Sequence, residues 1–320
     1  MRAFRIVVLA CAALSAASAS AQGYPARPVR LVVPFAAGGA VDTVARALGQ
    51  KLMEGWKQPV LVDNRPGAGG NIAADAVAKA PPDGYTLLIT TQGFAISPSL
   101  YTKLPFDATR DLAPVTQLTS SFLVLVCSPQ LPATSIRELI ALARARPGAI
   151  NYGSTGVGAP PHLLGELLKS SSGLDMLHVP YKGDAPLTQA LLAGEVQVAF
   201  MPLAGVLPHI KSGRLRALGV SGKARSATMP DVPTFTEAGI AFEFTGWLGI
   251  FAPGLAPREL VTRIQREFAT AVAAPDMLER WPAWGYEPVG NTPEQFAEKV
   301  RADMAMYAKV IRDAGIPPQD

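Results

Sequence analysis

The stretch Arg30-Leu31-Val32-Val33-Pro34-Phe35-Ala36-Ala37-Gly38-Gly39 runs from an apolar strand into a glycine-rich turn, and an amphipathic helix follows it. A second segment of the same design, Ile150-Asn151-Tyr152-Gly153-Ser154-Thr155-Gly156-Val157-Gly158, lies 120 residues further along the chain. A helix that begins on such a turn presents backbone N–H groups without intrahelical partners and the positive end of its dipole. Two such helix starts predict two α/β units that hold one acidic ligand between them.

Length and charge indicate an exported protein of two domains. The chain has 320 residues and 49% apolar residues, enough for two cores. Residues 1–21 combine basic Arg2 and Arg5 with a short apolar run and the small residues Ala19-Ser20-Ala21, the pattern of a signal peptide. Loss of these two arginines lowers the formal charge from +4 to +2. The remaining basic residues are scattered, so the sequence does not favour nucleic-acid binding.

Cysteine usage agrees with export but not with disulfides. Cys127 is the only cysteine left after cleavage at residue 21, and its apolar flank Leu123–Cys127 predicts a buried strand. Cys11 follows Val8-Leu9-Ala10, which is a faint lipoprotein-like signal. Cleavage there would leave almost no apolar region, so the signal peptide is the favoured interpretation.

Short apolar strands alternate with amphipathic helices in two blocks. The first block has a βαβαβ order, which predicts a parallel sheet with right-handed crossovers. A linker near Pro114–Phe122 precedes the second block, which repeats the design. The tail has one aromatic strand and two helices, so we expect it to fold back onto the first block and to cross between domains twice. The expected strands are Arg30–Val33, Val60–Asp63, Tyr85–Thr90, Leu123–Cys127, Ile150–Tyr152, His178–Pro180, Val196–Met201, Arg216–Val220 and Phe242–Phe251; the expected helices are Val41–Glu54, Asn71–Ala80, Ile136–Ala145, His162–Ser170, Leu187–Ala193, Leu203–Ser212, Arg258–Ala273 and Pro293–Ala314.

Two local patterns resemble known site motifs only in part. Gly67-Ala68-Gly69-Gly70 resembles a dinucleotide fingerprint, but Ile72 stands where the third glycine belongs. Asp42 lies in the first turn of its helix with Arg46 four residues on. It either compensates the helix dipole through an ion pair, or orders the turn before it and meets the ligand.

The histidines do not indicate a metal site. His162, His178 and His209 lack partners at zinc-site spacing, so no metal and no cofactor are predicted. His162 follows Ser154 and Thr155, which keeps a serine hydrolase open as an alternative, although the sequence has no G-x-S-x-G elbow. A hydrogen-bonding role at the helix start is the favoured interpretation of His162.

The loop Pro180-Tyr181-Lys182-Gly183-Asp184-Ala185-Pro186 joins a strand to a helix where second-block loops face the first block. Tyr181 offers a ring and a hydroxyl group to a cleft, or packs in the core. Lys182 is expected on the surface.

Taken together, the ordered segments resemble the tripartite tricarboxylate transporter substrate-binding proteins, also called the Bug family of periplasmic receptors. The resemblance covers essentially the whole mature chain, and it is specific through the order and spacing of several short motifs. These motifs are Tyr24-Pro25-Ala26-Arg27-Pro28-Val29-Arg30, Val33–Gly39 with Asp42, Asn64–Gly70, Pro82–Leu88, Asn151–Gly158, Val179–Gly183, Pro208–Gly213 and Pro230–Thr234.

The resemblance implies a periplasmic-binding-protein fold of type II, or "flytrap", in which two α/β domains with mixed sheets close on a two-strand hinge. The expected parts are a signal peptide (1–21), domain I (22–121 and 243–320) and domain II (122–242). The expected ligand is a small organic acid, held mainly by backbone N–H groups and delivered to transporter membrane subunits by a periplasmic monomer that is not an enzyme. The ligand-binding candidates are Phe35, Ala36, Gly38, Gly39, Asp42 and Asn71 on one side, and Thr155, Gly156, Gly158, Ala159, His162, Tyr181, Gly183 and Asp184 on the other.

The chain also departs from the family pattern. After Gly158 the family usually has a hydroxyl residue and a free N–H, whereas this chain has Ala159-Pro160-Pro161. Each lost charge-assisted hydrogen bond removes about 1.5–3 kcal/mol. We therefore expect the charge to bind at the first turn, which keeps its donors, and the ligand to be bulkier and less polar, such as an aromatic or branched carboxylate.

Two other functions stay open at this point. A ligand-presenting sensor for a two-component kinase would use the same closed form. A periplasmic hydrolase would use Ser154 or Thr155 with His162.

Overall fold

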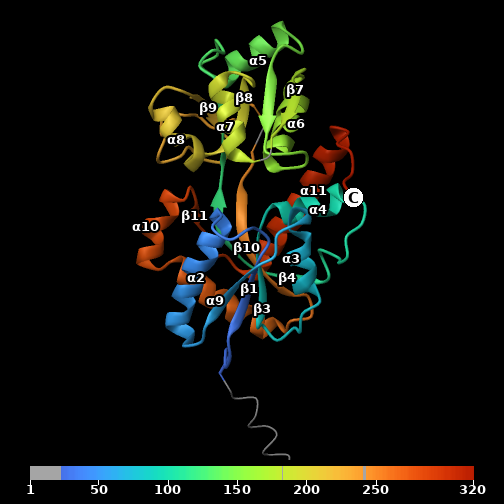
Figure 1. Cartoon of the computed structure of the whole chain (residues 1–320), viewed down its shortest axis with the longest axis vertical. Helices are drawn as coiled ribbons and strands as arrows, with labels where there is room; N and C mark the ends of the chain where they lie inside the picture. The colour runs from blue at the N-terminus through green and yellow to red at the C-terminus, as the bar shows by residue number, and fades with distance from the viewer. Residues whose placement is uncertain (1–22, 182, 241–242) are drawn as a thin grey trace, which may run out of the picture.

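The computed structural model describes residues 23–181, 183–240 and 243–320, and it folds into two α/β lobes stacked along the long axis (Figure 1). One sheet has the strand order β11-β4-β10-β3-β1-β2 and the other the order β7-β6-β8-β5-β9. The two-domain architecture with mixed, helix-flanked sheets agrees with the expectation. The predicted signal peptide and Lys182 lie outside the described residues. Within the described part of the chain, no helix combines the length and the apolar character needed to cross a membrane.

The first domain is built on the predicted parallel βαβαβ unit. Strand β1 lies between β2 and β3 and runs parallel to both. The apolar strand residues face helices on both sides, and Leu31, Val32 and Val33 are fully buried. The elements are β1 (Val29–Val33), α2 (Ala40–Trp56), β2 (Val60–Asn64), a 3-10 turn η2 (Ala68–Gly70), α3 (Asn71–Ala78), β3 (Thr86–Thr91) and α4 (Gly93–Leu100).

The tail completes this sheet, as predicted. Strand β10 (Gly246–Pro253) inserts antiparallel between β3 and β4 (Leu112–Ser121), and β11 (Glu287–Pro288) pairs with β4 at the edge. The predicted linker over Pro114–Phe122 is therefore wrong. Its polar residues hid a strand because Thr116 and Thr119 are buried inside the sheet. Helices α9 (Arg258–Val272), α10 (Pro275–Ala283) and α11 (Pro293–Asp313) follow; α10 and α4 were not predicted.

The second domain repeats the design with its own strands. Strand β6 runs parallel to β7 and β8, whereas β5 lies antiparallel between β8 and β9. Its elements are β5 (Leu123–Cys127), α5 (Ile136–Ala145), β6 (Asn151–Ser154), α6 (Pro160–Ser172), β7 (Leu177–Pro180), α7 (Asp184–Ala193), β8 (Val198–Pro202), α8 (Leu203–Lys211) and β9 (Arg216–Val220).

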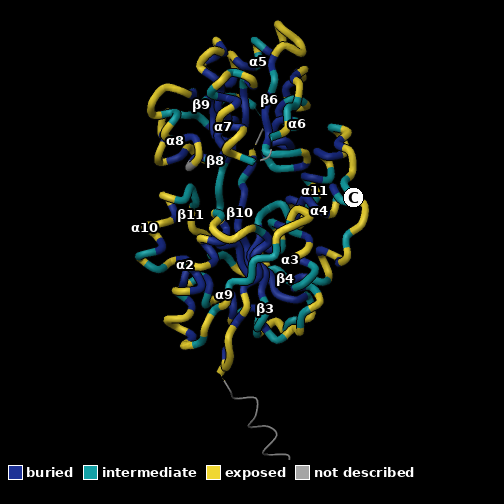
Figure 2. The backbone as a smooth tube through the Cα atoms, in the orientation of Figure 1, coloured by how far each residue is buried: buried dark blue, intermediate teal, exposed yellow. Residues whose placement is uncertain are grey.

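The two domains are joined by two chain crossings and by helix packing. The crossings are the step from β4 to β5 and the return into β10. On one side α11 packs against both α4 and α6. Leu100, Leu163 and Tyr307 consequently belong to one buried apolar cluster that spans both domains, and Figure 2 shows buried backbone in both lobes. The positions 121/122 and 242/243 stay a prediction for the domain boundaries.

Candidate functional site

A pocket of about 270 Å³ lies where three turns of the two domains meet. Phe35 follows β1, Thr91 and Gly93 lead into α4, and the turn 155–160 follows β6. Because β1 and β3 are adjacent parallel strands, their carboxyl ends reach the same edge of the sheet, where open α/β sheets bind ligands. The complete lining is Phe35, Gly69, Thr91, Gly93, Ile96, Ser97, Leu100, Tyr101, Thr155, Gly156, Val157, Gly158, Ala159 and Pro160.

A glycine sets the distance between the two domains at this pocket. Gly158 has φ +76°, and a Cβ atom placed on it would lie 2.3 Å from Leu100 Cδ2 of α4. Backbone of the second domain therefore rests directly on a side chain of the first. A larger residue at position 158 would overlap with the Leu100 side chain, so this side chain, the turn or the domains would have to move.

The first turn is tied down by a buried carboxylate. Gly38 N–H and Arg46 Nε donate to Asp42 Oδ2 at 2.8 and 2.9 Å. Asn64 Nδ2 donates to Asp42 Oδ1 at 2.9 Å and to the carbonyl oxygen of Phe35 at 3.0 Å. The hydrogen bond from Arg46, more than any other interaction, lowers the pKa of Asp42 to about 2, so it is ionised. Both interpretations of Asp42 hold in part, because it forms the ion pair and also orders the turn.

This network corrects the expectation that the first turn keeps all its donors. The N–H of Gly38 is used by Asp42, whose carboxylate already occupies part of the positive end of α2. The N–H groups of Ala40, Val41 and Asp42 still lack intrahelical partners, since the helix ladder begins with Thr43 N–H on the carbonyl of Gly39.

The second turn has fewer free donors than the sequence alone suggests. Helix α6 begins at Pro160 with Pro161 next, and neither proline has an N–H. In addition, Gly158 N–H donates to His162 Nδ1 at 3.0 Å, and Gly156 N–H donates to Ser154 Oγ at 3.2 Å. The turn is therefore held by its own side chains, and most of its donors are already paired.

The rings of Tyr152, His178 and His162 form a stack next to this turn. The rings of His162 and His178 lie 3.9 Å apart, and His178 stacks on Tyr152 at 4.9 Å. Ser154 Oγ lies 2.6 Å from His178 Nε2. The proposed pairing of Ser154 with His162 is therefore wrong: the partner is His178, which follows from the parallel pairing of β6 with β7. Ser154 is 0% exposed, so its hydroxyl group is closed to a substrate.

Because His178 is part of this ring stack, we expect the folded protein to lose stability in mild acid. Burial, reinforced by the nearby His162, lowers the pKa of His178 to about 4. A histidine with a native pKa below its unfolded value of about 6.5 favours the folded state when neutral. Its contribution is complete above pH 6.5 and is lost as the pH falls towards 4. We expect the urea midpoint of His178→Gln to change less than that of the wild type between pH 7 and 5, where most carboxylates stay ionised. Equal changes of the urea midpoint in the two proteins would contradict the assignment of this pH dependence to His178.

Five of the predicted binding residues line the pocket, and nine do not. Phe35, Thr155, Gly156, Gly158 and Ala159 form part of its wall. The others lie elsewhere in the two turns or behind them: Ala36, Gly38, Gly39, Asp42, Asn71, His162, Tyr181, Gly183 and Asp184.

The residues outside the wall have structural surroundings of their own. Tyr181 packs against the second-domain core, and its N–H donates to the carbonyl of Ser154 at 2.8 Å. Gly183 is the residue before α7, and Asp184 is an exposed residue in the first turn of that helix. Asn71 begins α3, and its buried Nδ2 has no hydrogen-bond partner among residues 23–181, 183–240 and 243–320.

Sequence reasoning missed the contribution of α4. Ile96, Ser97, Leu100 and Tyr101 come from α4 and the residue after it, and none was predicted. A signal was available, because strand β3 ends at Thr91 and is followed after one residue by Gly93, the first residue of α4, so here too a strand leads to a glycine at a helix start. Within the described ranges, no cluster of His, Cys, Asp or Glu has the arrangement of a metal site.

Comparison with known proteins decides the family. The model of the family described as "Tripartite tricarboxylate transporter family receptor" matches residues 44–316. The chain belongs to this family. It is accordingly a solute receptor and not an enzyme, which excludes the hydrolase alternative.

Relatives of this receptor share its length and fold. Protein BugT of Bordetella pertussis is 38% identical over 303 residues, 94% of this chain and 93% of BugT. The structure described as R. palustris Rpa4515 with adipate has 36% identity and a TM-score of 0.80, covering 93% of this chain and 100% of that one. MatC from Rhodopseudomonas palustris with bound malate has 30% identity and a TM-score of 0.75, with 90% and 100% coverage.

Proposed function

We propose that this receptor captures a small organic carboxylate in the pocket between Phe35, α4 and the turn 155–160, and delivers it to a tripartite transporter. The observation that carries the proposal is the composition of the pocket wall, which draws on both domains, so a bound ligand favours their closed arrangement. Relatives described with adipate and with malate support the choice of a carboxylate. We place the receptor in the periplasm, with residues 1–21 as its signal peptide.

The pocket wall favours a ligand with one charged end and an apolar body. Among the described residues that line it there is no Lys, Arg or His. A carboxylate there would rely on backbone N–H groups and on the hydroxyl groups of Thr91, Tyr101 and Thr155. Ile96, Leu100 and Val157 offer an apolar surface to the rest of the ligand. An aromatic or branched carboxylate fits this division better than a short, fully polar diacid.

The ligand is identified most directly by mass spectrometry of the small acids released when the purified protein is denatured. Thermal shifts with a panel of benzoate, branched acids, adipate, succinate and malate then rank the classes. We expect the largest shifts from aromatic or branched acids. A strong shift with succinate or malate and none with the less polar acids would contradict the ligand class, whereas no shift with any carboxylate would contradict the function.

A matched pair of valines tests the location of the site. Val157 lines the pocket and is 43% exposed, whereas Val289 is 41% exposed and lies outside it. Val157→Asp adds a negative charge beside the bound carboxylate, so we expect affinity to fall at least about tenfold, or 1.4 kcal/mol. Val289→Asp should leave affinity unchanged in the same calorimetric titration. Equal affinities of the two variants for the ligand would show that the turn 155–160 is not part of the binding site.

A further inference from the structure

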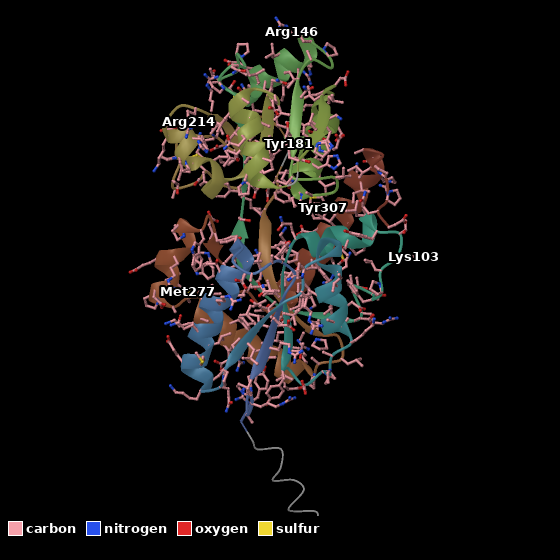
Figure 3. All side chains as sticks on the ribbon, viewed as in Figure 1. Lys103, Arg146, Tyr181, Arg214, Met277 and Tyr307 are labelled. Atoms are coloured by element: carbon pink, nitrogen blue, oxygen red, sulfur yellow. The ribbon has the colours of Figure 1, made fainter. Side chains whose placement is uncertain are left out.

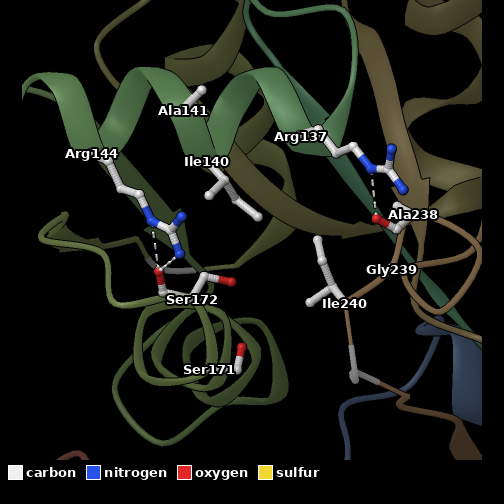
Figure 4. A pocket seen from close by; sticks show the side chains of 9 residues that line it. All are labelled: Arg137, Ile140, Ala141, Arg144, Ser171, Ser172, Ala238, Gly239 and Ile240. Carbon is white, nitrogen blue, oxygen red and sulfur yellow. Dashed lines mark hydrogen bonds between the residues drawn. The ribbon is translucent and has the colours of Figure 1, made fainter.

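A groove on the second domain is separate from the pocket between the domains. It has a volume of about 410 Å³ and lies between α5, the end of α6 and the segment 238–240 (Figure 4). We name it the α5 groove. Arg137, Ile140, Ala141 and Arg144 follow the i, i+3, i+4, i+7 spacing, so they form one face of α5. Figure 4 shows the two guanidinium groups at opposite ends, with Ile140 and Ile240 between them.

The two arginines have structural roles that leave most of their donors unused. Arg137 Nε donates to the carbonyl of Ala238 at 2.9 Å. Arg144 donates through Nε and one terminal nitrogen to the carbonyl of Ser172, the last residue of α6, at 3.1 and 2.7 Å. A guanidinium carries five N–H donors, so these bonds leave four on Arg137 and three on Arg144.

The charge of the groove is not neutralised from within. In the described part of the chain, no ion pair joins a carboxylate to Arg137 or Arg144. The acid closest in sequence to the 238–240 wall, Glu237, is engaged by Arg225 at 2.8 Å. Arg146 follows α5 at the same end of the molecule, far from the first domain (Figure 3), and adds to the positive charge.

The distance between the two arginines along α5 matches the repeat of an extended peptide segment. Seven residues along an α-helix span about 10 Å. A polyproline II segment repeats every three residues with a rise of about 3.1 Å per residue, so side chains at i and i+3 lie on one side about 9 Å apart. We propose that the α5 groove binds an extended acidic segment of a protein partner, with carboxylates at i and i+3 and an apolar residue between them. The carboxylates pair with Arg137 and Arg144 on the α5 wall, and the apolar residue, which projects from the adjacent side of the three-sided polyproline II segment, lies against Ile240 on the 238–240 wall. This proposal does not depend on what the pocket between the domains binds.

Fluorescence anisotropy with labelled peptides tests this inference on the purified mature protein at 50 and 200 mM salt. The probe is Gly-Glu-Pro-Val-Glu-Gly. One control replaces both glutamates by glutamine, and another, Gly-Glu-Glu-Pro-Val-Gly, keeps the composition but places the carboxylates side by side. We expect both controls to bind at least about tenfold more weakly than the probe. Binding of the probe should weaken at the higher salt concentration.

Protein variants supply the complementary test. Arg137→Gln with Arg144→Gln should abolish binding of the probe, whereas Arg266→Gln, an exposed arginine on α9, should not change it. Because both groove arginines also bond carbonyls, the thermal unfolding of the double variant is measured alongside. The peptide controls on the wild type decide the question even if that variant unfolds. Equal binding of the adjacent-carboxylate peptide, displacement by equimolar adipate, or binding of anionic vesicles but not of the probe would overturn the proposal.

Discussion

Gly158→Ala is expected to weaken ligand binding by about fivefold to a hundredfold, although it adds a single methyl group. The new Cβ would lie 2.3 Å from Leu100 Cδ2, a contact that crosses from the second domain to the first. Overpacking of this kind costs about 1–3 kcal/mol. When the domains separate the overlap disappears, so its cost falls on the closed, ligand-binding arrangement and subtracts directly from the binding free energy.

Two further variants separate this effect from backbone strain. Gly158 has φ +76°, so alanine there is strained in any arrangement of the domains. Gly173 has φ +63° with nothing within 4 Å of an added Cβ, and Gly173→Ala should lower stability without changing affinity. Leu100→Ala removes the overlapping atoms, but it also removes an apolar part of the pocket wall, so this variant is measured on its own as well. In calorimetric titration, Gly158→Ala should cost less affinity in the Leu100→Ala background than in the wild type. An equal cost in both backgrounds would show that the contact does not limit closure.

The fold was predictable where apolar periodicity was strong and where one strand followed another through a helix. Leu123–Cys127, Ile136–Ala145 and Arg216–Val220 match their predicted bounds. Strand β4 was missed because its buried residues include threonine and glutamine. Thr116, for example, is buried in the sheet, and its Oγ1 donates to the carbonyl oxygen of Asn291 at 2.7 Å. That partner is distant in the sequence, so local patterning does not reveal it.

The two glycine-rich turns show the same limit of sequence-based prediction in more detail. The sequence predicts which donors proline removes, because that loss is covalent. It does not show which of the remaining donors are already used. The N–H of Gly38 is used by Asp42, whose position depends also on Asn64 from the next strand, and the N–H of Gly158 is used by His162. The sequence analysis expected the ligand's charge to bind at the first turn, because only the second turn had lost donors. The structure weakens this contrast, since in each turn some backbone N–H groups are already paired within the protein.

Gly165→Ala is expected to destabilise the protein by about 2 kcal/mol, against the usual effect of this substitution in a helix. Gly165 lies inside α6, where alanine normally gains about 1 kcal/mol through helix propensity. Here the added Cβ would lie 2.2, 2.6 and 2.8 Å from Cε2, Cδ2 and Cζ of Tyr152. That ring is 2% exposed, stacks on His178 and donates its hydroxyl hydrogen to Glu166, so it has no free direction in which to move.

The matched control for this prediction is Gly205→Ala. Gly205 lies in α8, is exposed, and has nothing within 4 Å of an added Cβ, so alanine there should stabilise by about 0.5–1 kcal/mol. Urea unfolding at pH 7 gives both free energies, and the two variants should move in opposite directions. In a Tyr152→Leu background the cost of Gly165→Ala should shrink, because the smaller side chain leaves room for the methyl group. If Gly165→Ala stabilises the protein as much as Gly205→Ala does, then α6 and the strand beneath it are not packed as closely as the ring contacts require.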